Sequence, residues 1–405
     1  MRRFRIALSL TAVIAALAAG PVQADDNAER IPELRAPASV ARDVDGVPHI
    51  KAGNAHDLFF LQGRQHAEDR LFQMDVTRRR ASGTLAELVG AGALPSDVQM
   101  RRLGLRRSAE RTMPLLSRKT RQDLRAYADG VNAWIARNEL PGQYATVQVT
   151  KVKPWSVVDS VLALKLVAFG LSFDLDIDRT TAVEAFEAAG LDGRTAVFGD
   201  LAPFAPFREA SPVIDGTQRP VVRGTRRSRA IRGGAGVSKA VARMAANYLK
   251  RAKQAPAIAQ ALNRDAERGS NSWVISGRHT ANGRPILASD PHLSLDSPAL
   301  FSPIELDGAG FDIQGNSIPG SPYVILGQNR DVAFGLTTHF IDVTDTFVEQ
   351  VRSDPASPSG LSTVYEGRLE RSWQSTRPSA STRARRGDRT HSTWCLRVDR
   401  SRRRR

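Results

Sequence analysis

Apolar residues recur at helical spacing through much of the first half of the chain. The pattern covers residues 55–80, 121–135 and 154–169, where apolar positions return every three or four residues. That period is typical of helices that bury one face. Two short apolar runs around an Asp-Gly pair at residues 40–50 predict two strands joined by a turn. We therefore predict that the first 200 residues are mainly helical.

After residue 270 the pattern changes to short runs that alternate between apolar and polar positions. These runs are separated by glycines and an Asn-Gly pair, and they cover residues 272–276, 285–288, 311–315, 323–327 and 332–336. Such runs predict strands. Helices followed by antiparallel strands indicate an α+β fold.

The segment between these halves, residues 217–269, has a different character. It contains the basic run 223–232, three nearby glycines and one basic stretch near residues 241–251 that predicts a helix. An ordinary interdomain linker would have this composition. A spacer propeptide that is excised from a precursor would have it too, and both interpretations stay open at this point.

The N-terminus has the features of an export signal. Residues 1–5 are basic, residues 6–19 are almost entirely apolar, and small residues at Val22 and Ala24 precede two aspartates. This order predicts a signal peptide over residues 1–24, because the apolar run is short for a spanning helix. An uncleaved membrane anchor is the alternative. We expect a periplasmic or secreted protein with no other membrane-spanning segment.

The net charge of +16 is concentrated at the C-terminus. Residues 371–405 carry a net charge of +10, which leaves +6 for the other 370 residues. This arginine-rich tail lacks the apolar periodicity and interleaved aromatics of a nucleic-acid-binding domain and is typical of disorder. We expect no nucleic-acid partner, although a basic binding protein that acts through the tail is an alternative. With Cys395 as the only cysteine, a large core or a metal ion must stabilise an exported chain.

The dipeptide Gly269-Ser270 suggests a catalytic function. A serine that becomes a new N-terminus carries its own general base, since an α-amine has an unperturbed pKa of about 7.7–8.0. The side-chain hydroxyl then becomes a nucleophile at neutral pH. A serine in an ordinary turn is the alternative, because Gly-Ser is a common dipeptide.

Several motifs together resemble the precursors of the penicillin acylase (penicillin amidase) family, which are N-terminal nucleophile hydrolases. The matching blocks are Arg42-Asp43-x-x-Gly46-Val47-Pro48-His49-Ile50, Ala67 to Asp75, Gly83 to Glu87, Tyr127 to Ile135, Pro154-Trp155, Gly269 to Val274, Asn282 to His292 and Gly315 to Gly320. They lie in the family's order between residues 38 and 350.

The resemblance implies an αββα sandwich assembled from two chains of one self-cleaving precursor. The mainly helical α chain is then residues 25–216, the spacer is residues 217–269, and the β chain begins at Ser270 and is recognisable over residues 270–354. Cleavage occurs between Gly269 and Ser270, and the chains remain together as a heterodimer. The mature serine attacks a small acyl amide and forms an acyl-enzyme. Penicillin-type side chains and acyl-homoserine lactones are both candidate substrates.

The family's other site residues transfer to individual positions. His292 matches a residue beside the nucleophile that helps to orient it, although a structural histidine is the alternative. Thr338 matches the position whose backbone N–H stabilises the oxyanion. The resemblance also implies a structural calcium ion and no organic cofactor. Its ligands are Asp176, Asp342, Thr344 through its carbonyl, and Asp345, with Asp174 and Asp178 as rivals of Asp176; acidic surface loops are the alternative.

The chain departs from the family after the first strands of the β chain. It ends 135 residues after Ser270, whereas family β chains are several hundred residues long, and the resemblance fades near Tyr365. We expect residues 355–405 to be a largely non-homologous, disordered tail, as in a truncated or frameshifted gene product. No residue matches the family's downstream oxyanion asparagine. An inactive remnant of such an enzyme is therefore the alternative to an active amidohydrolase.

Overall fold

The computed structural model describes most of the two halves that the sequence predicts. The described residues are 29–172, 269–293, 296–337, 350–357, 360–365 and 367–371, with a few isolated positions between 182 and 250. The predicted signal peptide, most of the predicted spacer and the arginine-rich C-terminus lie outside these residues. No helix among the described residues is long and apolar enough to cross a membrane.

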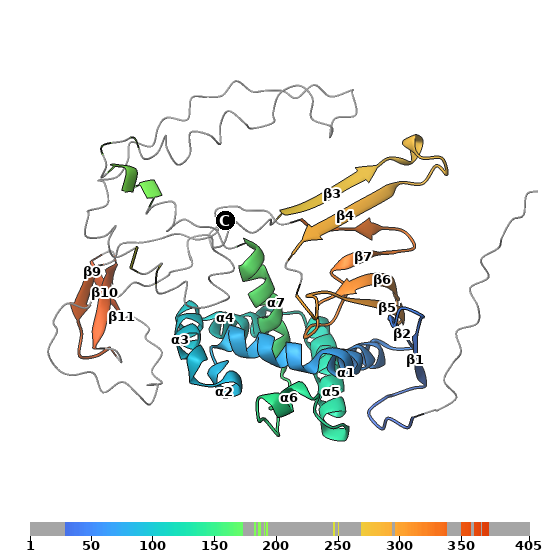
Figure 1. Ribbon diagram of the computed structural model, residues 1–405, viewed down its shortest axis with the longest axis horizontal. Helices are drawn as coiled ribbons and strands as arrows, with labels where there is room; N and C mark the ends of the chain where they lie inside the picture. The colour runs from blue at the N-terminus through green and yellow to red at the C-terminus, as the bar shows by residue number, and fades with distance from the viewer. Residues whose placement is uncertain are drawn as a thin grey trace, which may run out of the picture.

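Helices form one side of the molecule (Figure 1). The three long ones are α1 (Ala55–Ser82), α5 (Arg118–Arg137) and α7 (Val157–Ser172), and the short ones are α2 (Ala86–Val89), α3 (Leu94–Leu103), α4 (Leu105–Thr112) and α6 (Gln143–Thr146). The long helices agree with the three predicted segments. Helices α2 to α4 were not predicted, because all three are too short to establish a clear apolar period.

Helix α1 crosses α5 at very short range, and two glycines permit it. A Cβ atom at Gly130 would lie 1.8 Å from the carbonyl oxygen of Phe60, and one at Gly63 would lie 2.1 Å from that of Tyr127. Both contacts are with backbone, so no side-chain rotation could relieve them. The glycines therefore fix how closely the two helices pack.

A six-stranded sheet packs against α1 and takes strands from both halves of the chain. Its order is β1 (Ala38–Arg42), β2 (Pro48–Ala52), β5 (Ser302–Gly308), β6 (Phe311–Ser317), β7 (Leu326–Asn329) and β8 (Ala333–Phe334). All neighbours are antiparallel except β2 and β5, which are parallel. Ile50, Phe59 and Leu306 belong to one buried core between the sheet and the helices. The prediction of an α+β fold is confirmed.

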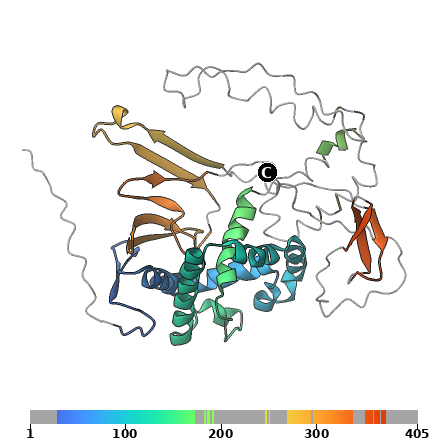
Figure 2. The same ribbon diagram turned by 180° about the vertical axis from the view of Figure 1, so that it is seen from behind.

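Two smaller sheets complete the described structure (Figure 2). Strands β3 (Gly269–Ile275) and β4 (Ile286–His292) form a hairpin that lies beside the β7–β8 end of the six-stranded sheet, and a short 3-10 turn follows β3. Strands β9 (Gln350–Ser353), β10 (Leu361–Tyr365) and β11 (Arg368–Arg371) form an antiparallel sheet.

The third sheet corrects one expectation. The prediction that residues 355–405 form a disordered tail is wrong for residues 361–365 and 368–371, which are strands. Leu361 and Val364 supply apolar positions on β10, and Gly367 has φ 75°, which allows the tight turn into β11. These apolar positions and the glycine are typical of a hairpin. The prediction of disorder followed instead from the arginine-rich composition of the residues after them.

A buried polar network joins the helices to the sheet. His66 of α1 lies 2.7 Å from the hydroxyl of Tyr127 through Nδ1 and 2.9 Å from the hydroxyl of Ser317 through Nε2. Ser317 donates to the Ser302 carbonyl, and the Gly320 N–H donates to Tyr127. Burial first, and then the nearby charge of Arg70, lowers the pKa of His66 to about 3. His66 is therefore neutral, with its proton on Nε2 and with Nδ1 accepting from Tyr127.

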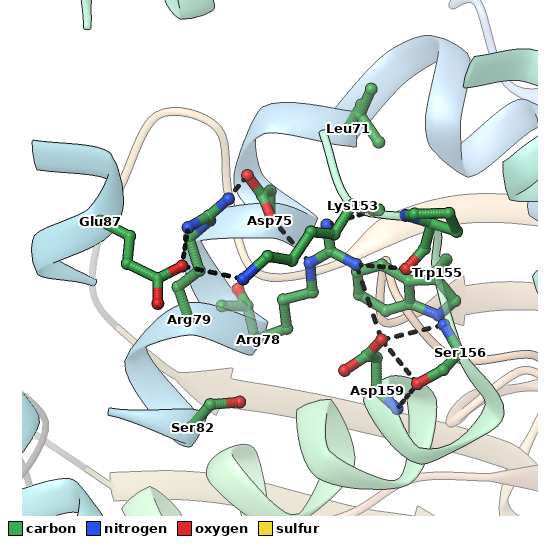
Figure 3. Close-up of polar contacts among 12 residues, drawn as sticks. Leu71, Asp75, Arg78, Arg79, Ser82, Glu87, Lys153, Trp155, Ser156 and Asp159 are labelled. Atoms are coloured by element: carbon green, nitrogen blue, oxygen red, sulfur yellow. Dashed lines mark hydrogen bonds and ion pairs between the residues drawn. The ribbon is translucent and has the colours of Figure 1, made fainter. Parts of the chain in front are cut away.

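A second buried network organises the end of α1 (Figure 3). The fully buried carboxylate of Asp75 accepts from Arg78 at 2.7 Å and from Arg79 at 3.0 Å. The guanidinium of Arg78 also donates to the Lys153 and Pro154 carbonyls and lies over the ring of Trp155. These contacts anchor the segment that leads into α7. The motif residues Asp75 and Trp155 therefore have structural roles.

Candidate active site

Ser270 is the second residue of strand β3, at the open end of the β3–β4 hairpin. In the register of this hairpin Gly269 faces His292, Ser270 faces Pro291 and Asn271 faces Asp290. The peptide bond between Gly269 and Ser270 therefore lies in the last rungs of a regular ladder. The bond therefore has extended geometry and lies next to the backbone of His292.

His292 is paired with a carboxylate. Its Nε2 lies 2.9 Å from Oδ2 of Asp290, two residues earlier on the same strand, and both side chains are partly or largely exposed. Residues two apart on a strand share a face, which is why the two side chains meet. The carboxylate is well placed to fix the orientation of the imidazole.

The register places Ser270 and His292 in adjacent rungs. Since side chains alternate along a strand, the hydroxyl of Ser270 lies on the face of Pro291, and the imidazole of His292 lies on the opposite face with Asp290. In this uncut chain the two residues are therefore neighbours through their backbones. The prediction that His292 orients Ser270 remains a prediction.

The segment after β8 contacts the face of the hairpin that carries Ser270 at one place. Gly335 lies directly over Ser289 and close to Ser272, which face each other in the ladder. The described chain continues from there only to residue 337, one residue before Thr338. Thr338 itself lies outside the described residues.

The predicted calcium ligands Asp176, Asp342, Thr344 and Asp345, and the rivals Asp174 and Asp178, also lie outside the described residues. Within the part of the chain that the structure describes, no group of three or more His, Cys, Asp or Glu side chains is arranged to hold a metal ion. The calcium site therefore stays a prediction.

Two features of this site were missed from the sequence. Asp290 could have been identified from its i, i+2 spacing to His292 on a predicted strand. The contact of Gly335 with Ser289 could not, because it depends on how β8 approaches a hairpin about 45 residues earlier in the chain.

Comparisons with known proteins define the class of this molecule. The model of the penicillin amidase family matches residues 37–394. The chain therefore belongs to the penicillin amidase family. The match includes Gly269, Ser270 and His292, and it continues beyond Tyr365, near which the resemblance was expected to fade.

Individual relatives carry related names. The chain is 32% identical over 337 residues to the penicillin acylase 2 proenzyme of Pseudomonas sp. (strain SE83), with 80% of this chain and 39% of that protein covered. It is 32% identical over 318 residues to the acyl-homoserine lactone acylase QuiP of Pseudomonas aeruginosa, covering 78% of this chain and 34% of the relative. It is 28% identical over 349 residues to penicillin G acylase of Escherichia coli, covering 78% and 40%. These names indicate amidohydrolases.

The chain thus spans about two fifths of the length of the curated relatives it matches. Among solved structures, it is similar to a thermostable penicillin G acylase from Alcaligenes faecalis, with 28% identity and a TM-score of 0.38 over 45% of this chain and 98% of that one.

Proposed function

We propose that this chain is a precursor that cleaves itself between Gly269 and Ser270 and then hydrolyses N-acyl amides with Ser270 as the nucleophile. The observation that carries the proposal is the position of this peptide bond in the terminal rungs of the β3–β4 ladder, in a chain that belongs to the penicillin amidase family. The bond is held in extended geometry at a strand end.

The chemistry after cleavage needs few groups. The free α-amine of Ser270 accepts the hydroxyl proton, directly or through a water molecule, while Oγ attacks the amide carbonyl. The tetrahedral intermediate expels the amine, which takes up that proton, and an ester on Ser270 remains. Water then attacks the ester carbonyl, releases the acid and returns the proton to Oγ. We assign the backbone N–H of residue 338 to the oxyanion. The orientation of Ser270 by His292 is proposed for the cleaved chain only, because in the uncut ladder the two side chains lie on opposite faces.

The two halves are suited to remain associated as an α/β heterodimer after cleavage. Strand β2 pairs with β5, and His66 and Tyr127 form hydrogen bonds with Ser317 and Gly320 across the future break. These contacts are buried, so separation of the halves would expose both a sheet edge and polar groups. The αββα sandwich is the arrangement we propose for the whole protein, with export to the periplasm or the exterior.

We retain calcium as a proposed structural ion. The carboxylates of Asp176, Asp342 and Asp345, and the carbonyl of Thr344, are hard oxygen donors of the kind calcium prefers. The ion would link the two chains and takes no part in the reaction described above.

The names of the relatives support a substrate class but not a particular substrate. Their names divide between penicillin acylases and acyl-homoserine lactone acylases. Both substrates are N-acyl amides, and we propose that class without choosing between an aromatic and an aliphatic acyl chain.

Mass spectrometry of the purified 405-residue chain tests the proposal. We expect a fragment that begins at Ser270, its absence from the Ser270→Ala variant, and its presence in the matched control Ser272→Ala, which alters a serine on the same strand. A persistently intact parent chain would refute self-cleavage. A cleaved chain that does not hydrolyse N-phenylacetyl or N-octanoyl amides would favour the inactive remnant.

A further inference from the structure

Tyr323 has a backbone conformation that few side chains tolerate. Its φ angle is 80°, in the left-handed region that glycine adopts freely and a bulky residue does not. Tyr323 lies in the loop between β6 and β7. Two residues later the chain joins the sheet, where the Ile325 N–H donates to the Asn316 carbonyl at 2.8 Å. The turn at Tyr323 therefore directs the chain out of the loop and into β7.

One side chain of α1 binds both backbone groups of Tyr323. The fully buried amide of Gln62 accepts from the Tyr323 N–H at 3.2 Å through Oε1 and donates to the Tyr323 carbonyl at 3.3 Å through Nε2. The two groups must face the same amide, which fixes the backbone between them. A different φ angle would turn at least one of them away from Gln62 and leave a polar group without its partner, which is unfavourable inside a protein.

The side chain of Tyr323 is bound by the same half of the chain. Its ring meets the ring of Phe59 edge-on with centroids 5.1 Å apart, and its hydroxyl donates to the Asp123 carboxylate at 3.0 Å. Asp123 also forms an ion pair with Lys119 at 2.8 Å. All of these contacts come from α1 and α5, which precede the proposed cleavage, whereas Tyr323 follows it.

The preceding part of the loop also lies among the helices. The Gly320 N–H donates to the Tyr127 hydroxyl at 2.9 Å, and a Cβ atom at Gly320 would lie 3.3 Å from the ring of Trp155. Ser321 is almost completely buried. The chain therefore passes through the helical half before it reaches β7.

Strand β7 connects this loop to the hairpin that carries the proposed nucleophile. It pairs with β8, and β8 ends next to Gly335. A Cβ atom at Gly335 would lie 2.4 Å from Oγ of Ser289 on β4. The path of β7 and β8 beside this hairpin therefore begins at the turn that Gln62 binds.

We propose that Gln62 and Tyr323 form a latch: docking of α1 imposes the left-handed conformation on Tyr323, and this conformation places β7 and β8 beside the nucleophile hairpin. Without Gln62 the backbone at Tyr323 relaxes to the conformations that L-residues prefer by a factor of about ten. The inference rests on the proposed function in one respect, because it makes self-cleavage at Ser270 depend on a docked helical half. Gln62 is then a positioning residue for that cleavage.

Hydrogen exchange of the uncut Ser270→Ala chain, followed by mass spectrometry of peptides covering residues 324–334, tests the latch. Gln62→Leu removes both hydrogen bonds at similar size, and we expect these amides to exchange about tenfold faster. The double variant Gln62→Leu/Tyr323→Gly should exchange more slowly than Gln62→Leu, because glycine adopts the left-handed region freely. A merely structural role predicts the opposite, since this variant also loses the aromatic ring.

Two matched controls accompany these variants. Gln62→Leu/Tyr323→Phe keeps the ring and the backbone preference of an L-residue, and we expect no recovery of protection. Gln65→Leu removes another buried amide of α1, whose partner Glu68 belongs to the same helix. We expect Gln65→Leu to keep the exchange of the parent chain over residues 324–334.

The rate at which the Ser270 terminus appears in the otherwise native 405-residue chain tests the link to cleavage. We expect Gln62→Leu to slow this rate about tenfold and Tyr323→Gly to restore part of it in the double variant. Parent-like exchange in Gln62→Leu, or no recovery in the double variant, would overturn the inference and leave the proposed function standing. The expected exchange with an unchanged cleavage rate would overturn the link between latch and cleavage. A parent chain that never shows the Ser270 terminus would overturn the proposed function and that link together.

Discussion

The buried side chain of His66 should make the free energy of unfolding depend on pH. We expect the fold to lose stability as the pH falls below about 6.5, before most carboxylates titrate. The pKa of His66 is about 3 in the folded chain, against the ordinary value of 6.5 for histidine. Between these values the unfolded chain binds a proton that the folded chain does not, so the free energy of unfolding decreases as the pH falls. The stabilisation is fully present above pH 6.5 and diminishes as the pH falls toward 3.

The magnitude follows from this difference. One group in this window changes the free energy of unfolding by about 1.4 kcal/mol per pH unit. Between pH 7.5 and 4.5 the loss is therefore about 3 kcal/mol, a large share of the stability of a typical domain. The structural reason is that Ser317 already donates its proton to Ser302, so His66 must donate from Nε2 and accept at Nδ1. A second ring proton would displace the one that Tyr127 donates.

Urea unfolding at several pH values, followed by tryptophan fluorescence, measures this slope. We expect the slope to be lost in His66→Gln, which keeps an amide donor and acceptor but does not titrate. The slope should persist in Ser317→Ala, which loses a hydrogen bond but keeps the buried imidazole. The reasoning would be refuted if His66→Gln and the parent chain lost equal stability between pH 7.5 and 4.5.

Two further substitutions test the packing of α1. Gly130→Ala would bring a methyl group within 1.8 Å of the Phe60 carbonyl oxygen, so the two helices must separate; we expect a loss of about 3 kcal/mol or more in the free energy of unfolding, measured by urea titration. Asp75→Asn would remove the carboxylate that Arg78 and Arg79 share, while Arg78 keeps Asp159 and Arg79 keeps Glu87 as ion-pair partners; we expect a loss of about 1.5–3 kcal/mol, seen as a lower thermal midpoint.

Each of these variants has a control. Gly92→Ala makes the same change as Gly130→Ala where a Cβ meets no atom within 4 Å, and should leave the urea midpoint unchanged. Asp69→Asn removes an exposed partner of Arg42 and should cost about 1 kcal/mol or less. Equal losses in a variant and its control would contradict the packing argument.

The parts of the fold that depend on local pattern could be predicted from the sequence. The apolar period of residues 55–80 corresponds to α1, and the Asp45-Gly46 turn corresponds to the β1–β2 hairpin. The buried network around His66 could not be predicted, because its partners are 61 and 251 residues away along the chain. Nothing within the helix distinguishes His66 from an exposed histidine.

The candidate site was predictable in its chemistry but not in its geometry. The identity of Ser270 followed from the surrounding motifs. The distance between the Ser270 hydroxyl and the His292 imidazole depends on the register of β3 and β4. A change of one residue in that register would move every side chain of a strand to the other face. The contact at Gly335 depends on the docking of two separate sheets and leaves no periodic signal in the sequence.

The parallel pairing of β2 with β5 has a consequence for the order of events during biosynthesis. His49 aligns with Glu305 in this pairing, so two neighbouring strands of the sheet come from opposite sides of Ser270. While the polypeptide is continuous, closing this loop is an intramolecular step whose entropic cost grows only with the logarithm of its length. Once the chain is severed, the same step becomes a bimolecular encounter that slows on dilution. The cleavage we propose must therefore follow pairing of these strands, and the connecting segment would serve first as a tether for assembly.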